Sequence, residues 1–254
     1  MKHKIIEIRN LSHIYDKKTG SGIKDINLSI FKGEFIIFAG RNGSGKSTLF
    51  CHLNGLLSPG SGKVLVENKN IKKNLTHARR TVGMVFQDAD TQIVGETVFD
   101  DTAFGPENLK FSRKIINKKV FSSLNKLGLL PLKDRNPSTL SGGEKRKLAI
   151  AGILAMNPEV IVFDEPFSNL DYPGTLELIE CIKELHRSGH TILIATHDIE
   201  KIVSCATRLI IMDNGIIAAD DKPVNLLKQL ETFGIREPCA SKLGMDISRI
   251  SWTS

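Results

Sequence analysis

Short apolar runs rich in β-branched residues recur along the chain, separated by polar and glycine-containing segments. Runs of this length and composition are typical of strands buried on both faces of a parallel sheet. Helical patterns follow the later runs, as in Thr175–Arg187, and this alternation indicates an α/β layered fold. The predicted strands are Ile5–Ile8, Ile26–Ile30, Phe35–Ala39, Val82–Phe86, Val160–Phe163, Thr191–Ala195 and Leu209–Met212.

Two stretches depart from this alternation. Near the N-terminus the paired runs are separated by Gly22 and Gly33, which predicts a small antiparallel β-subdomain. Between Thr91 and Ile150 the strand runs vanish and lysine-rich amphipathic segments appear, which predicts an inserted helical subdomain. We therefore assign residues 1–90 and 155–235 to an α/β core with its β-subdomain, residues 91–154 to the helical subdomain, and residues 236–254 to a tail after a short helix over Val224–Leu230.

Composition narrows the class of protein without giving its function. The 254 residues are 41% hydrophobic and 25% charged, which is ordinary for a soluble globular protein. The four cysteines are scattered, with no CxxC pair, which favours reduced intracellular thiols over disulfides or a zinc site. The longest strongly apolar stretches, such as Ala149–Met156, are too short to cross a membrane, so a membrane role requires a partner.

The net charge of +7 has three open explanations. A basic surface suits nucleic acid, work beside an anionic inner leaflet, or lysines that are simply solvated. No RNA- or DNA-binding motif accompanies the charge, so we expect no direct nucleic-acid partner.

A phosphate-binding loop follows the apolar run Phe35–Ala39. The sequence GRNGSGKS, starting at Gly40, matches G-x-x-x-x-G-K-[ST] and precedes a predicted helix, TLFCHLNG. Glycines let several backbone N–H groups converge on one phosphate, Lys46 is expected to reach the β- and γ-phosphates, and Ser47 is expected to ligate Mg²⁺. The alternative is a glycine-rich turn without a ligand. The expected ATP-binding residues here are Gly40, Arg41, Asn42, Gly43, Ser44, Gly45, Lys46, Ser47 and Thr48.

Two carboxylates end the predicted strand at Val160–Phe163. Parallel α/β sheets place their chemistry at the carboxyl ends of strands, and adjacent strand residues point to opposite faces. We therefore expect Asp164 to hold Mg²⁺ through water and Glu165 to act as general base on the attacking water. The alternative is an acidic turn after a strand.

Two further polar residues follow apolar strands. His197 comes after TILIAT and is equally consistent with a contact to the γ-phosphate and with a helix-start histidine capped by Thr196 or Asp198. Gln87 comes after VGMVF, where its amide oxygen could complete the Mg²⁺ shell or simply be solvated.

A second glycine-rich helix start lies at Ser141–Glu144. Ser141 and Glu144 form a capping box, which is a complete structural explanation of the motif. Gly142 and Gly143 are nevertheless poor helix formers, and bare N–H groups at a helix start bind anions. Because one phosphate loop is already present, this second site suggests a phosphate held by a different protomer, and hence a dimer.

With these motifs in this order, the whole chain resembles an ATP-binding-cassette (ABC) ATPase. The resemblance implies a P-loop NTPase fold with a RecA-like parallel-sheet core, and it makes Tyr15 the aromatic that stacks on adenine, although a core or surface tyrosine is the alternative. The other matching positions are the Q-loop glutamine Gln87, the signature Leu140–Glu144, Walker B at Ile161–Glu165, the D-loop Ser168–Asp171 and the switch histidine His197.

The resemblance also implies how the motifs work. Two copies, or this chain and a paralogue, would pair head to tail around two ATP molecules. The phosphate loop of one chain and Ser141, Gly142, Gly143 and Glu144 of the other would then hold each nucleotide. The catalytic residues would be Glu165, His197 and Lys46, with Ser47, Gln87 and Asp164 around Mg²⁺. ATP-driven closure would move a membrane partner.

The segment Phe86–Leu109 and the tail FGIREPCASKL resemble energy-coupling-factor ATPases, the group that includes cobalt and nickel importer ATPases. This implies a peripheral protein on the cytoplasmic side of the cell membrane, bound to a transmembrane scaffold and a substrate-capture subunit, that drives uptake of a transition metal ion or a vitamin. The rivals are another transport cassette and a non-transport cassette acting on ribosomes or DNA. The solute is chosen by the other subunits.

Three positions depart from the pattern of the group. Phe167 stands where threonine is common, Asn169 stands where glycine or alanine is usual, and Asp100-Asp101 replaces a more common glutamate pair. The first two touch the D-loop and therefore bear on communication between two ATP sites.

Overall fold

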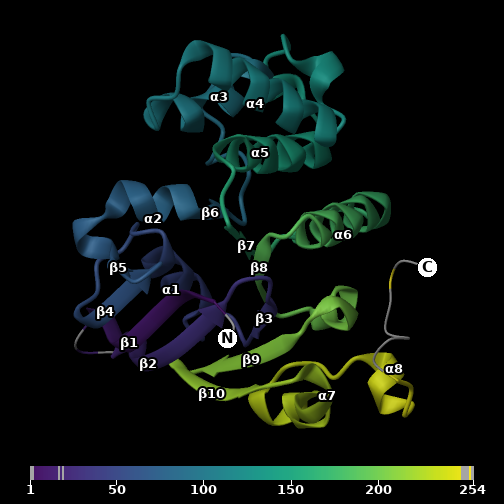
Figure 1. The fold of residues 1–254 in the computed structure, drawn as a ribbon. Helices are drawn as coiled ribbons and strands as arrows, with labels where there is room; N and C mark the ends of the chain where they lie inside the picture. Colours follow the sequence, from purple (N-terminus) through teal and green to yellow (C-terminus); the bar gives the residue numbers. More distant parts are fainter. Residues whose placement is uncertain (1–2, 17, 19, 247–251, 253–254) are drawn as a thin grey trace.

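The computed structural model describes residues 3–16, 18, 20–246 and 252, and within them the strands form two sheets (Figure 1). One sheet has four strands in the order β2-β1-β4-β5, and the other has six in the order β10-β9-β3-β8-β7-β6. The strands are β1 (Lys4–Asp16), β2 (Ser21–Phe31), β3 (Phe35–Ala39), β4 (Ser61–Val66), β5 (Lys69–Asn70), β6 (Val82–Val85), β7 (Val160–Asp164), β8 (Thr191–Thr196), β9 (Arg208–Asp213) and β10 (Ile216–Asp221).

The six-stranded sheet is parallel from β9 to β6, and β10 runs antiparallel at its edge. Every residue of β3, β6, β7 and β8 is buried, which explains why these strands appear as continuous apolar runs. In β3, Phe35 and Ile37 belong to the core on one face, while Ile36 and Phe38 belong to the core on the other. The sheet is therefore covered on both sides.

The four-stranded sheet is antiparallel throughout, which confirms the predicted N-terminal β-subdomain. Gly22 lies at the start of β2 with a φ of 145°, and a Cβ there would lie 1.9 Å from the carbonyl oxygen of His13. Only glycine fits this approach of two strands. The sequence pattern missed β4, whose apolar run of three residues follows Ser-Gly-Lys, and β5, which consists of a lysine and an asparagine.

The helices lie outside the sheets (Figure 1). They are α1 (Lys46–Leu53), α2 (Leu75–Thr81), α3 (Val98–Asn108), α4 (Arg113–Lys126), α5 (Gly142–Met156), α6 (Tyr172–Arg187), α7 (Pro223–Leu226) and α8 (Cys239–Lys242), with 3₁₀ turns at Ile71–Lys73, Leu130–Leu132, Pro137–Thr139, Ile199–Lys201, Val203–Cys205 and Leu227–Phe233. Helices α3, α4 and α5 pack on one another. In the sequence they come between β6 and β7, where the described chain forms no strand.

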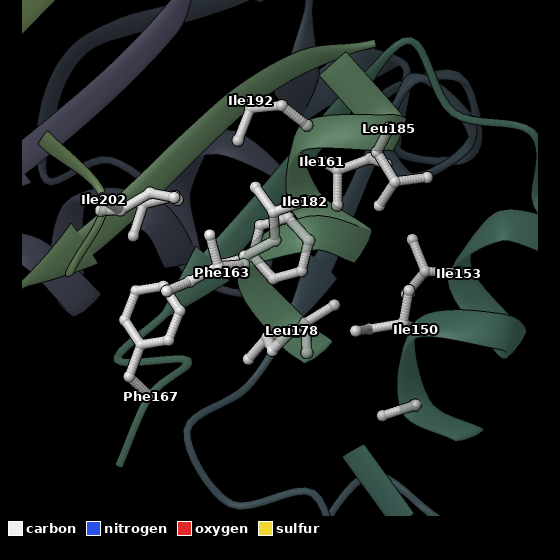
Figure 2. Packing of buried hydrophobic residues seen from close by; sticks show 14 of the residues in the cluster. Ile150, Ile153, Ile161, Phe163, Phe167, Leu178, Ile182, Leu185, Ile192 and Ile202 are labelled. Atoms are coloured by element: carbon white, nitrogen blue, oxygen red, sulfur yellow. The ribbon is translucent and has the colours of Figure 1, made fainter. Parts of the chain in front are cut away.

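Helix α6 covers one face of the six-stranded sheet (Figure 2). Its buried residues Leu178, Ile182 and Leu185 share a cluster with Phe163 of β7 and Ile192 of β8. Their spacing of four and three residues forms the apolar stripe expected of a helix packed on a sheet. Asp171 caps α6, so the helix begins before the predicted Thr175.

The structure also corrects the end of one predicted strand and the type of one predicted helix. The strand predicted to reach Phe86 ends at Val85, because the side chain of Gln92 accepts the Phe86 N–H at 3.2 Å. The helix predicted over Val224–Leu230 is one α-helical turn followed by a 3₁₀ turn. In a 3₁₀ turn residues i and i+3 lie on one face, which buries Leu227 and Leu230 together.

Two predictions concern the tail and the membrane. Part of the predicted tail, residues 247–251 and 253–254, lies outside the described residues. In the part of the chain that is described, no helix combines the length and apolarity needed to cross a membrane.

Candidate nucleotide site

The phosphate loop runs from the end of β3 to the start of α1. Gly43 and Gly45 have φ values of 82° and 103°, in the region that favours glycine. A Cβ on Gly40 would lie 2.4 Å from the carbonyl oxygen of Met212, and one on Gly45 would lie 2.7 Å from Cγ2 of Ile23. The protein's own packing therefore requires glycine at these positions.

Lys46 is held across the loop that precedes it. Its Nζ donates to the carbonyl oxygens of Gly40 at 2.7 Å and Arg41 at 3.1 Å, and it lies 3.9 Å from Oε1 of Glu165. Burial lowers the pKa of Lys46, opposed by the charges of Glu165 and Asp164. Among the described residues no side chain caps α1. The first residues of α1 line one cavity, and they include Lys46 with its buried ammonium group. This combination suits a phosphate.

The predicted carboxylates are buried at the end of β7. Neither Asp164 Oδ1 nor Glu165 Oε1 has a hydrogen-bond partner among the described residues. Burial raises the pKa of Asp164, partly offset by a hydrogen bond with Ser47. Buried oxygens of this kind are costly unless a cation or donor satisfies them. The Ser47 hydroxyl and Asp164 carboxylate are oxygen donors that fit Mg²⁺.

His197 lies beside Glu165. Its Nδ1 is 3.0 Å from Glu165 Oε2, although the two residues follow different strands, β8 and β7. Both alternatives for His197 stay open, because it also directly precedes Asp198, the N-cap residue of the 3₁₀ turn Ile199–Lys201, and the Asp198 N–H donates to the Thr196 hydroxyl at 3.1 Å.

An open cavity of about 350 Å³ brings most of the predicted site together. The phosphate loop from Asn42 to Thr48, Tyr15, Gln87, Glu165 and His197 line it, while Gly40 and Arg41 contribute the carbonyl oxygens that hold Lys46. The Tyr15 hydroxyl lies 3.3 Å from Thr48 Oγ1. Ser21 and Gly22, at the start of β2, also line the cavity and were not predicted as site residues. The available signal in the sequence was the glycine between the paired apolar runs.

The residues Ser141–Glu144 do not line this cavity in the described chain. They form the predicted capping box at the start of α5: Ser141 N donates to Glu144 Oε2 at 2.7 Å, and Glu144 N donates to Ser141 Oγ at 3.3 Å. A Cβ added to Gly142 or Gly143 would meet nothing within 4 Å in the described chain. The two glycines are therefore not explained by contacts within one copy.

Comparison with known proteins settles the family. The family model described as ABC transporter matches residues 23–168. The chain belongs to the ABC transporter family.

Among its relatives, a putative ABC transporter ATP-binding protein of Methanosarcina mazei is 41% identical over 96% of this chain, which spans 55% of that protein's length. The energy-coupling factor transporter ATP-binding protein EcfA1 of Caldanaerobacter subterraneus is 43% identical over 97% of this chain and 88% of that protein. The solved structure of cbiO1 from Clostridium perfringens, part of the ABC transporter complex cbiONQ, matches with a TM-score of 0.80 and 35% identity over 96% of this chain and 99% of that one.

These matches confirm the resemblance to energy-coupling-factor ATPases and the P-loop NTPase fold. The protein is therefore an ABC ATPase that binds ATP. The cavity is lined by the phosphate loop together with Gln87, Glu165 and His197 of a single chain.

The sequence analysis did not single out Arg146 in the ABC signature helix. Arg146 is buried in α5, and its guanidinium donates to the carbonyl oxygens of Phe86 at 3.0 Å and Ser168 at 3.4 Å. It thereby joins the signature helix to the residue before Gln87 and to the D-loop. In the sequence it stands within the basic run KRK, which looks like a solvated surface, so no local signal marks it.

The three departures from the family pattern have local structural roles. Phe167 is buried in the core beside α6, with Lys201 Nζ 5.8 Å from its ring centre (Figure 2). Asn169 has a φ of 60°, a conformation that asparagine tolerates better than most residues. Asp101 is buried and accepts the N–H groups of Val94 at 2.8 Å and Gly95 at 3.0 Å, which orders the segment before α3.

Proposed function

We propose that the protein hydrolyses ATP with Mg²⁺ at the phosphate-loop cavity. The observation that carries this proposal is the pair of buried carboxylates without hydrogen-bond partners for Asp164 Oδ1 and Glu165 Oε1, next to Lys46. Ser47, Asp164 and Gln87 are the oxygen donors that would hold Mg²⁺, which would neutralise phosphate charge when bound.

In this proposal Glu165 is the general base. His197 Nδ1 is within hydrogen-bond distance of Oε2, which leaves Oε1 to accept a proton from water. The water oxygen attacks the γ-phosphorus, the bond to the bridging oxygen of ADP breaks, and the water proton passes to Glu165. Lys46 holds the β- and γ-phosphates, and His197 orients the carboxylate.

Replacing Glu165 with glutamine tests this assignment. Glu165→Gln keeps the shape of the side chain and removes the base, so we expect ATP binding to persist and turnover to fall about 10²- to 10⁴-fold. Glu177→Gln, on the exposed side of α6, is the matched control and should hydrolyse ATP normally. Hydrolysis by Glu165→Gln at the wild-type rate would remove Glu165 from this role.

We further propose that each ATP is completed by the signature of a second chain, in a head-to-tail homodimer or a pair with a paralogue. Support comes from the open space at Gly142 and Gly143 and from their absence from the cavity of their own described chain. An uncovered helix start of this kind can approach the partner's nucleotide closely.

An aspartate in place of Gly143 distinguishes ATP binding by one chain from dimer formation. With Glu165→Gln as background, ATP should convert monomer to dimer in size-exclusion chromatography. Adding Gly143→Asp should abolish the dimer while ATP affinity of the monomer stays the same, because Gly143 is outside its own chain's cavity. Ser122→Asp, exposed on α4, adds the same charge as a control. Dimer formation despite Gly143→Asp would exclude the signature from the interface.

We propose that this ATPase is the peripheral subunit of an energy-coupling-factor importer on the cytoplasmic side of the cell membrane, driving uptake of a transition metal ion such as cobalt or nickel, or of a vitamin. An apolar groove of about 590 Å³ between α2, β6, α3 and α5 supports a docked membrane scaffold. Phe104 at this groove is 52% exposed, and Phe86 and Gln92 place the groove beside the Q-loop.

Docking in the groove can be tested with two phenylalanines. Phe104→Asp should abolish co-purification with the membrane subunits and leave ATPase activity of the isolated protein unchanged. Phe121→Asp is the control, because Phe121 is also exposed but lies on α4 outside the groove. Uptake by the reconstituted complex with cobalt, nickel or a vitamin then identifies the solute.

A further inference from the structure

Four residues beside the cavity, Tyr15, His13, His52 and Thr48, form a closed ring of contacts. The Tyr15 hydroxyl lies 3.3 Å from Thr48 Oγ1, and the Tyr15 ring packs edge-on against His13 with centroids 4.7 Å apart. His13 in turn packs edge-on against His52 at 4.9 Å. His52 Nδ1 lies 2.7 Å from the carbonyl oxygen of Thr48, which closes the ring.

Burial and backbone contacts hold the two histidines in place. His52 is completely buried in α1, the helix that begins at Lys46. Burial lowers the pKa of His52, and the neighbouring His13 lowers it further, which favours a neutral ring. His13 Nδ1 lies 3.2 Å from the carbonyl oxygen of Ser58, so the His13 ring is held on both sides.

Tyr15 is the side chain that needs such support. It is 58% exposed, and an exposed tyrosine loses rotamer freedom when a ligand stacks on it. Of the described residues that line the cavity, Tyr15 and His197 carry aromatic rings, and His197 is engaged by Glu165. Tyr15 is thus the ring available to the base of a nucleotide whose phosphates occupy the loop.

We propose that His13 is a positioning residue that holds Tyr15 over the cavity as a platform for the nucleotide base. Through His52 it ties that platform to helix α1, so the base and phosphate sites are fixed to one another. This inference rests on the proposed ATP site. The edge of the imidazole restrains the tyrosine ring while Thr48 restrains its hydroxyl, which prepares the stacking face before ATP arrives.

The test compares ATP with inorganic tripolyphosphate, which has no base. His13→Ala should weaken ATP binding about 5- to 30-fold, the range of a weakened base stack. Affinity for tripolyphosphate and kcat at saturating ATP should not change. His13→Phe retains the edge-on ring and should restore ATP affinity, and His77→Ala, on α2, is the control histidine. In a Tyr15→Ala background, His13→Ala should add nothing.

Each other result overturns the inference. Unchanged ATP affinity in His13→Ala would show that Tyr15 needs no support, and equal weakening of ATP and tripolyphosphate would show that His13 only maintains the loop. A wild-type protein that binds tripolyphosphate but shows no ATP preference has no base platform. If wild type binds neither compound, the proposed ATP site itself fails.

Discussion

Helix α1 follows a glycine-rich loop and helix α5 begins with two glycines, but the two sets of glycines have different neighbours. At α1, a side chain on Gly40 or Gly45 would collide with Met212 or Ile23 of the same chain. At α5, a side chain on Gly142 or Gly143 would meet empty space in the described chain. The first start has no side-chain cap among the described residues, and the second has a complete capping box.

This difference separates two uses of the same residue type. The glycines before α1 shape a loop that packs against other residues of the same chain. The glycines of α5 leave a well-capped helix start uncovered in the described chain, as the proposed contact with a second chain requires. Substitutions at the two starts should therefore affect different properties: stability at α1 and association at α5.

The largest effect is expected for Gly45→Ala. The left-handed backbone at φ 103° and the contact with Ile23 should cost about 1–3 kcal/mol of unfolding free energy, together with ATP binding. Urea unfolding of the nucleotide-free protein measures this loss, with Gly128→Ala as a comparison for positive φ without a steric neighbour within 4 Å in the described chain. Equal losses would mean that backbone strain alone requires glycine at Gly45.

A smaller effect is expected for Ser141→Ala, which removes the cap of α5. The lost hydrogen bond to Glu144 N should lower unfolding free energy by about 0.5–2 kcal/mol. Ser141→Thr or Ser141→Asp can accept the same bond and should recover most of the stability. Failure of both replacements to recover it would indicate that the hydroxyl serves another contact.

Gly142→Ala should change stability in the opposite direction to Gly45→Ala. Alanine is the better helix former, so thermal stability should stay the same or rise by up to about 1 kcal/mol. The same substitution should reduce ATP-dependent dimer formation, because its methyl group occupies the approach to α5. A clear loss of monomer stability would contradict the comparison between the two helix starts.

The smallest effects are pH dependences of opposite sign. Hydrogen bonds with Ser141 lower the pKa of Glu144, so its contribution is present above the unfolded pKa near 4.5 and is lost as the pH falls through the folded value. This contribution to stability is small because the Glu144 side chain is partly exposed to solvent. Burial raises the pKa of Asp164 above 3.8, so stability is lost as the pH rises through that window.

Replacing each carboxylate with the corresponding amide tests the direction of both pH dependences. Asp164→Asn should raise the thermal midpoint of the nucleotide-free protein at pH 7, and the gain should vanish below pH 3.8. Glu144→Gln should slightly lower the midpoint at pH 7 and not at low pH. If Asp164→Asn stabilises the protein and abolishes Mg²⁺-dependent ATP binding, then Asp164 lowers stability but is required for function.

Local patterns determined much of the molecule from the sequence alone. Strands β3, β7 and β8 were predictable because burial on both faces makes nearly all of their residues apolar, and the phosphate loop was predictable because its residues form one continuous motif in the chain. The capping box at Ser141 and Glu144 was predictable for the same reason. Strands β4, β5 and β10 were missed, since β4 begins with Ser-Gly-Lys, β5 has no apolar residue and β10 ends in two aspartates.

Only the tertiary structure decided which distant residues meet. Arg146 of α5 reaches the carbonyl oxygens of Phe86 and Ser168, Glu165 lies beside Lys46, and His13 of β1 meets His52 of α1, because the fold brings together elements that are far apart in the sequence. Side-chain contacts of this kind leave no periodic trace in the sequence. The sequence determined the groups that can bind phosphate, and the packing determined that one chain encloses one of the two glycine-rich helix starts and leaves the other open.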